Sequence, residues 1–121
     1  MTLYKNPACA CCGEWAEHMR ANGFGVDVKE SGNMAEVRKE LGVPNRIASC
    51  HTAVVNGYVI EGHVPADLIR KLLAERPGII GLAVPGMPAG VPGMPDPGPG
   101  RAPYDILAFR ADSSTDVYAT R

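Results

Sequence analysis

The stretch TAVVNGYVIEG, residues 52–62, constrains the fold of this chain more than any other segment. It holds two runs rich in β-branched and aromatic residues, separated by Asn56-Gly57. Asn-Gly is the preferred dipeptide of a two-residue type I′ turn, because both of its residues accept a positive φ. The segment therefore predicts a tight β-hairpin.

The segments before this hairpin begin with a strand and a helix. TLYKNP predicts a short strand that stops at Pro7, because proline cannot donate to a strand ladder. A helix is expected over residues 11–22, where Trp15 and Met19 lie four positions apart and Gly23 follows the helix end. Trp15 is interpreted as a packing residue.

A second strand and helix follow in the same order. FGVDVKE alternates apolar and polar residues, which is typical of a half-buried strand. A helix is expected over residues 33–41, with Asn33 as N-cap and Glu36 at the capping-box position. Gly42 and Pro44 close it.

The part after the hairpin starts with a third predicted helix, over residues 65–76, in which Pro65 suits the first helical position. Glycine and proline then dominate residues 77–103, so a long loop is expected there. YDILAFRA and DVYATR predict a second hairpin at the C-terminus. The element order indicates an α/β fold with a thioredoxin-like layout, a mixed sheet with flanking helices, in a single domain over residues 1–121.

The composition excludes several classes of protein. The chain has 121 residues, a net charge of −1 and 6% aromatic residues, so it offers neither a basic surface nor stacking platforms for nucleic acid. No apolar run approaches the roughly 20 residues of a membrane span. The start, MTLYKNP, lacks the features of a signal peptide. A cytoplasmic protein and a mature form with an added Met both remain open on this basis.

Cysteines form the main chemical feature. PACACCGEW places Cys9, Cys11 and Cys12 at the predicted start of the first helix, while Cys50 lies far away in sequence. In the predicted topology, the loop with Cys50 and His51 and the end of the hairpin with His63 reach the same sheet edge. Thiols at a helix N-terminus become acidic, because unpaired N–H groups stabilise the thiolate.

Such a cluster supports several functions. Cys9 and Cys12 form a C-x-x-C pair suited to disulfide exchange, although a third thiol between them invites scrambling. Zinc is a second possibility, but structural zinc sites usually combine two separate C-x-x-C pairs, and Cys50 stands alone. Cu(I) is soft and forms clusters in which thiolates bridge several ions, so crowded cysteines favour copper.

Further ligands are expected outside the cysteines. Met87 and Met94 each sit in a repeated P-G-M-P, and thioethers prefer Cu(I) to zinc. His63 is a candidate ligand because of its predicted return to the edge. His51 ranks lower, since successive side chains tend to point apart, and His18 is expected to be solvated on its helix.

The motifs together resemble a known family. YKNPACACCGEWAEHMRANGF, GVPNRIASCHTAVVNGYVIEGHVPADLIRKLL and GLAVPGMPAGVPGMP are similar to segments of the CopG family of bacterial copper-resistance proteins, and they cover nearly the whole chain. The resemblance implies a periplasmic, thioredoxin-like, copper-binding domain. It places the family's C-x-C-C motif on Cys9, Cys11 and Cys12, and the later family cysteine on Cys50.

These observations lead to two hypotheses. The first is a Cu(I)-binding protein of copper homeostasis that holds more than one copper per chain and exchanges it with other periplasmic copper carriers or exporters. Its predicted ligands are Cys9, Cys11, Cys12, Cys50, His63, Met87 and Met94. The alternative is a thiol-disulfide or copper oxidoreductase on the same scaffold. Aerobic oxidation is expected to pair Cys9 or Cys11 with Cys12 or Cys50.

Overall fold

A computed structural model describes residues 1–86, 88, 90–92, 98 and 102–121, and for residues 10 and 11 it describes the backbone. Helices and strands follow one another from Thr2 to Ala83, and two more strands lie near the C-terminus. Their bounds are β1 Thr2–Lys5, α1 Ala10–Ala21, β2 Asp27–Glu30, α2 Met34–Leu41, a 3-10 turn Asn45–Ile47, β3 His51–Val55, β4 Tyr58–Glu61, α3 Ala66–Glu75, β5 Gly81–Ala83, β6 Asp105–Phe109 and β7 Thr115–Thr120.

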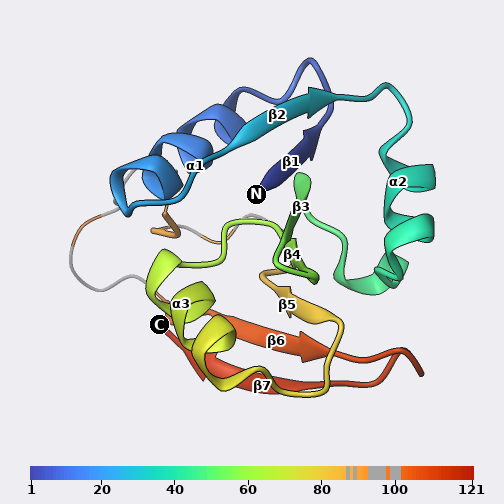
Figure 1. The fold of residues 1–121 in the computed structure, drawn as a ribbon, viewed down its shortest axis with the longest axis vertical. Helices are drawn as coiled ribbons and strands as arrows, with labels where there is room; N and C mark the ends of the chain where they lie inside the picture. Colours follow the sequence, from blue (N-terminus) through green and yellow to red (C-terminus); the bar gives the residue numbers. More distant parts are fainter. Residues whose placement is uncertain (87, 89, 93–97, 99–101) are drawn as a thin grey trace.

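The strands form one mixed sheet in the order β2-β1-β3-β4-β5-β6-β7. Two neighbouring pairs, β1 with β2 and β4 with β5, are parallel, and the other neighbours are antiparallel. The predicted α/β class, with a mixed sheet, flanking helices and a C-terminal hairpin, is confirmed (Figure 1). The narrower thioredoxin-like assignment stays a prediction.

The predicted central hairpin is present as β3 and β4. Its turn residues Asn56 and Gly57 have φ values of 47° and 87°, as a type I′ turn requires. Val55 pairs with Tyr58 across the turn. This register returns the end of β4 to the sheet edge at which β3 begins.

Each face of the sheet carries its own apolar core. Tyr58 and Ile60 of β4 pack in a first core with residues of α1 and α3. Val59, between them in sequence, packs in a second core with Val43 and Ile47 from the segment after α2. Because successive strand residues point to opposite faces, α1 and α3 cover one face and the α2 region the other. Figure 1 shows α1 and α3 to the left of the sheet and α2 to the right.

The helix ends follow the local signals. The side chain of Asn33 accepts a hydrogen bond from the backbone N–H of Glu36, and Gly42 ends α2 with a φ of 81°. Gly23 follows α1 with a φ of 90°. Pro65 is the N-cap of α3, one position before its predicted place.

Two expectations about strands were wrong. β2 is exposed along its whole length rather than half-buried, because the apolar residues that pack on the first core, Phe24 and Val26, precede it. The predicted loop over residues 77–103 contains the buried strand β5. β5 approaches β4 so closely that a Cβ at Gly81 would overlap the carbonyl oxygen of Val59.

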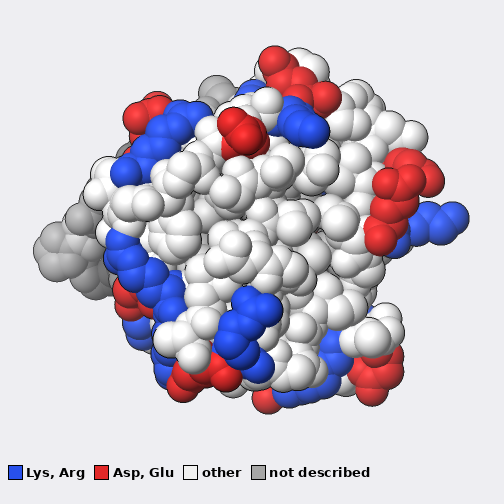
Figure 2. Space-filling view, in the orientation of Figure 1, with Lys and Arg blue, Asp and Glu red and all other residues white. Residues whose placement is uncertain are grey.

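Charged side chains of both signs are interspersed on the face in Figure 2, around a centre that is largely uncharged. This face carries no single-sign patch that could attract a highly charged polymer. Among the described residues, no helix combines the length and the apolar character that crossing a membrane requires.

Candidate metal centre

The loop before α1 positions Cys9, the first cysteine of the cluster. Asn6 organises this loop: its side-chain oxygen accepts the N–H of Ala8 at 2.9 Å, and its carbonyl accepts the N–H of Cys9 at 3.0 Å. Lys5 Nζ donates to the Cys9 carbonyl at 3.2 Å. Cys9 is the N-cap of α1, and Cys12 lies buried in the first turn of this helix.

Three sulfur atoms from two distant segments meet at this helix start. Cys9 and Cys12 are joined in a disulfide. The sulfur of Cys50 lies with theirs in a group whose members are all within 4.8 Å of one another. Cys12 Sγ is 3.6 Å from the Cys50 carbonyl oxygen. The structure thus places Cys50 where the predicted topology put it.

The two histidines lie on the other side of Cys50. His51 begins β3 and His63 follows β4, and both are buried. One nitrogen of each lies within the same 4.8 Å limit of Cys50 Sγ and of the other. Cys50 Sγ is 3.2 Å from His51 Nδ1. The expectation that these two side chains point apart was wrong, because Cys50 precedes β3 and strand alternation does not apply to it.

The charge of the two imidazole rings decides whether they could bind a metal. His63 Nδ1 lies 2.5 Å from the carbonyl oxygen of Pro92, which can only accept, so Nδ1 carries the proton and Nε2 the lone pair. Burial lowers the pKa of His51 to about 3 and also lowers the pKa of His63, so both rings are neutral at pH 7. Neutral imidazole is the form that binds metals.

Unsatisfied nitrogen atoms indicate that a metal fits here. Among the described residues, His51 Nε2 and His63 Nε2 are buried without a hydrogen-bond partner. Buried polar groups without partners are rare in folded proteins, because their desolvation is costly. A metal ion would satisfy them, and the thiol and imidazole groups around it are ligands of soft and borderline ions.

A buried ion pair holds the Cys50 loop in place. Glu61, fully buried at the end of β4, accepts from Arg38 Nε at 2.8 Å and from the Ser49 N–H at 2.7 Å. Arg38 also donates to the Ser49 carbonyl at 2.6 Å, and Thr52 donates to Glu61. Burial raises the pKa of Glu61, against these hydrogen bonds, which lower it. Thus α2, through Arg38, positions the residue next to Cys50.

Sequence reasoning missed this pair. A signal was present, because Glu61 ends an otherwise apolar strand, YVIE, where a buried carboxylate requires a partner. The identity of the partner was not readable from the sequence. Arg38 lies 23 residues away on α2, and only tertiary packing brings it to Glu61.

Two further side chains near the site have structural roles. Trp15 is fully buried, donates to the Val64 carbonyl at 3.1 Å and packs on His51 with 4.6 Å between ring centroids, so its predicted packing role is confirmed. The prediction of a solvated His18 was wrong. Its Nε2 accepts the N–H of Ala66 at 3.3 Å, because α1 packs beside the start of α3.

The structure describes less of the other three predicted ligands. Cys11 is the second residue of α1, between two members of the sulfur group. Met87 and Met94 lie outside the described residues. The assignment of all seven predicted residues as ligands stays a prediction.

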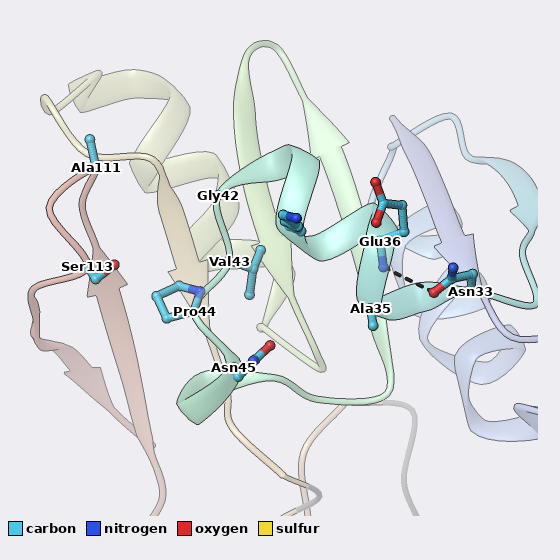
Figure 3. A pocket seen from close by; sticks show the side chains of 10 residues that line it. Asn33, Ala35, Glu36, Gly42, Val43, Pro44, Asn45, Ala111 and Ser113 are labelled. Carbon is cyan, nitrogen blue, oxygen red and sulfur yellow. Dashed lines mark hydrogen bonds between the residues drawn. The ribbon is translucent and has the colours of Figure 1, made fainter.

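A separate hollow of about 520 Å³ lies between α2 and the β6–β7 turn. Figure 3 shows Asn33 and Glu36 on one side of it and Ser113 on the other. None of the cysteines or histidines that the structure describes lines this hollow. The chemistry of the cluster is thus separate from it.

The fold and the site define a class of protein: a mixed α/β fold with a cluster of thiol and imidazole groups that could hold a metal near the start of its first helix. Two solved structures, titled "Copper resistance protein copG- Form 2" and "Copper resistance protein copG- Form 1", are each 40% identical to the chain with a TM-score of 0.91. The matches cover 99% of this chain and 95% and 94% of those chains. The chain belongs to the CopG family.

Two other comparisons add less. A family profile described as "Protein of unknown function, DUF411" matches residues 47–94, which include Cys50 and His63 but not the N-terminal cysteines. No curated protein sequence matches the chain.

Proposed function

We propose that this protein binds Cu(I) in copper resistance or homeostasis. The observation that carries the proposal is the convergence of the sulfur atoms of Cys9, Cys12 and Cys50 within 4.8 Å at the start of α1. Reduction of the disulfide would supply thiolates there, and the helix N-terminus stabilises their charge. Thiolate and thioether are the ligands that select Cu(I).

The ligand number supports more than one copper per chain. Cys11 adds a fourth thiol, and one Cu(I) ion uses only two or three sulfur atoms, so bridging thiolates would hold a cluster. His63 supplies a buried nitrogen at its edge. Met87 and Met94 are proposed as additional soft ligands.

Both solved relatives are named as copper resistance proteins, which supports this biological role. We further propose a periplasmic location, exchange of copper with other periplasmic carriers or exporters, and a single metal-binding domain over residues 1–121. These proposals depend on the resemblance to the family rather than on site geometry.

Titration with Cu(I) tests the binding function. The fully reduced protein, kept anaerobic, should bind more than one equivalent, and X-ray absorption should show sulfur ligands and a short copper–copper distance. Cys50→Ser should reduce the stoichiometry. Saturation at one equivalent or fewer in the wild-type protein would contradict a cluster.

Substitution of the two predicted methionine ligands, Met87 and Met94, tests their role separately from that of the cysteines. Met87→Leu and Met94→Leu should weaken Cu(I) binding, whereas Met19→Leu, in the first core, should not. Met19 has the same thioether, buried among apolar side chains. Equal effects at all three positions would indicate a packing role.

A disulfide oxidoreductase is the second candidate, because the Cys50 thiol lies beside the Cys9–Cys12 disulfide. A thiolate at this position could attack one of its sulfur atoms. This function predicts that one cysteine substitution abolishes turnover while copper binding partly survives. Parallel loss of both in every cysteine variant would favour binding alone.

A further inference from the structure

We propose that the exposed edge of β2 pairs with the same edge of a second copy of this chain, in an antiparallel register centred on Val28. This interface lies outside the cysteine and histidine cluster, and its formation does not depend on copper binding. Within the described residues, β2 is the last strand on one side of the sheet and pairs with β1 alone. Figure 1 shows β2 and β7 on opposite sides of the sheet.

The backbone of β2 presents open hydrogen-bonding groups at Val28. The N–H of Asp27 donates to the Met1 carbonyl at 3.0 Å, and the N–H of Ser31 donates to the Lys5 carbonyl at 2.8 Å. Successive residues of a strand point their N–H and C=O groups to alternate sides, so those of Val28 point away from β1. Two such residues placed opposite each other in an antiparallel pair exchange both hydrogen bonds. Val28 opposite Val28 of a second copy therefore satisfies both groups on each chain.

The charges of β2 select this register. With Val28 on the two-fold axis, Asp27 of each copy lies opposite Lys29 of the other, so opposite charges face each other twice. Moving the axis by one residue places Asp27 opposite itself or Lys29 opposite itself, and like charges in such positions are destabilising. An axis between two residues sets an outward-pointing residue opposite an inward-pointing one, which breaks the ladder. Charged residues on an edge strand usually prevent pairing, but this arrangement favours one register.

Val28 also supplies an apolar contact. Among the described residues, Val28 and Val117 are the exposed large hydrophobic side chains, and Val28 is 41% exposed. Val28 pairs in register with Leu3, which is fully buried in the first core. Residues opposite each other on neighbouring strands point to the same face of a sheet, so the two Val28 side chains would meet beside that core. Pairing thus removes apolar surface from water.

The other edge of the sheet is less suited to pairing. Val117 on β7 is 54% exposed, but the register of β7 with β6 shifts between Ile106 and Leu107. Such a bulge bends and twists an edge strand, which protects it from a partner. β2 keeps an unbroken register with β1 over its four residues. The interface is therefore assigned to β2.

One side chain limits the length of the new ladder. The carbonyl of Val26, just before β2, accepts a hydrogen bond from Arg20 at 3.1 Å. A partner strand cannot use this acceptor while Arg20 holds it, so the ladder is confined to β2 itself. Such a small interface gives a weak dimer whose formation depends on protein concentration.

Sedimentation equilibrium of the full chain tests the pairing. The protein is kept reduced, with a chelator, so that neither intermolecular disulfides nor bound metal can join two copies. Between about 10 μM and about 1 mM, the wild-type protein should pass from monomer to dimer. Asp27→Lys should weaken dimerisation at least about tenfold, because it places like charges opposite each other twice. Combining it with Lys29→Asp restores opposite charges and should regain the wild-type affinity.

Two further measurements address the backbone. Val28→Pro removes the outward N–H without removing a hydrogen bond to β1, so it should keep the fold, checked by circular dichroism, and abolish the dimer. Val117→Lys, on the other edge, is the matched control and should leave dimerisation unchanged. In hydrogen exchange, the N–H of Val28 should gain protection as the wild-type concentration rises. The N–H of Asp27, already bonded to Met1, should not change.

A wild-type protein that stays monomeric at about 1 mM would overturn the proposal. A dimer that survives Val28→Pro would overturn it as well, as would a double charge variant as weak as Asp27→Lys alone. Loss of the dimer in Val117→Lys would place the interface on β7 instead. The charge variants change exposed side chains, so they decide the outcome even if Val28→Pro fails to fold.

Discussion

At the residue scale, Gly62 decides where His63 lies. It has a φ of 78°, and a Cβ at this position would come within 2.6 Å of the Val84 carbonyl oxygen and of Ser49 Oγ. Its N–H donates to the His51 carbonyl at 3.0 Å. A residue without a side chain therefore lets the chain turn sharply out of β4 and bring the two histidines together.

Gly62→Ala should lower the free energy of unfolding by about 3 kcal/mol, from the left-handed backbone and from overlap with a carbonyl that cannot move freely. Gly57→Ala is the matched control, since Gly57 has a φ of 87° but nothing within 4 Å of its Cβ position. It should cost only about 1 to 2 kcal/mol. Urea unfolding measures both, and equal losses would contradict the steric argument.

The buried ion pair between Arg38 and Glu61 also acts at the residue scale. A buried ion pair gains little net stability, because desolvation offsets the attraction. Its value here is geometric, since Glu61 binds the N–H of Ser49 and Arg38 binds the Ser49 carbonyl. Together they hold the backbone beside Cys50.

At the scale of elements, α1 and α3 are linked by one histidine. Pro65 offers no side-chain cap to α3, and the first N–H of that helix, from Ala66, binds His18 Nε2 on α1. This acceptor exists only while the ring is neutral. The contact between the two helices therefore depends on pH.

The pH dependence has a definite sign. Burial lowers the pKa of His18 below its usual 6.5, although Asp67 raises it in part. The unfolded chain thus binds more protons just below pH 6.5, and the free energy of unfolding falls as the pH falls through this range. His18→Gln should reduce this fall, by at most about 1.4 kcal/mol per pH unit. Denaturant titrations from pH 7.5 to 5.5, with a chelator, measure the difference, and identical slopes would contradict it.

Elements with strong local signals were predicted well. The hairpin at Asn56-Gly57 and the helix capped by Asn33 depend on residues close in sequence. β5 was missed because three residues, GLA, carry no periodicity of their own. They become a strand only because β4 and β6 pair with both of their edges.

At the scale of the whole molecule, the C-terminal hairpin is part of the core. Ile106 and Ala108 of β6 pack in the first core, on the face with α1 and α3. Phe109 packs in the second core with Val43 and Ile47. A segment predicted as two added strands thus contributes to both faces of the sheet.

Phe109→Ala should therefore lower the free energy of unfolding by about 3 to 5 kcal/mol, as expected for a large cavity in a core. Val117→Ala, on β7, removes a side chain that is 54% exposed and should cost less than about 1 kcal/mol. Thermal unfolding of the two variants provides the measurement. A small effect of Phe109→Ala would show that the hairpin is an independent appendage.

The candidate site was predictable in part. The element order put the start of α1, Cys50 and His63 at one sheet edge, and the structure brings the described members together. The contact between the Cys50 and His51 side chains, the role of His18 and the ion pair of Glu61 were not predicted. Each depends on side-chain directions across elements, which spacing along the chain does not encode.

The sequence by itself determined the helices, the tight hairpin and the cysteines at a helix start, because capping, turn geometry and periodicity act over a few residues. Only the tertiary structure decided which sulfur and nitrogen atoms share one site, since contacts such as Cys12 with Cys50 join residues 38 positions apart. Burial then made both imidazoles neutral and left one nitrogen of each without a partner among the described residues. These two effects arise only when distant segments pack together and exclude water.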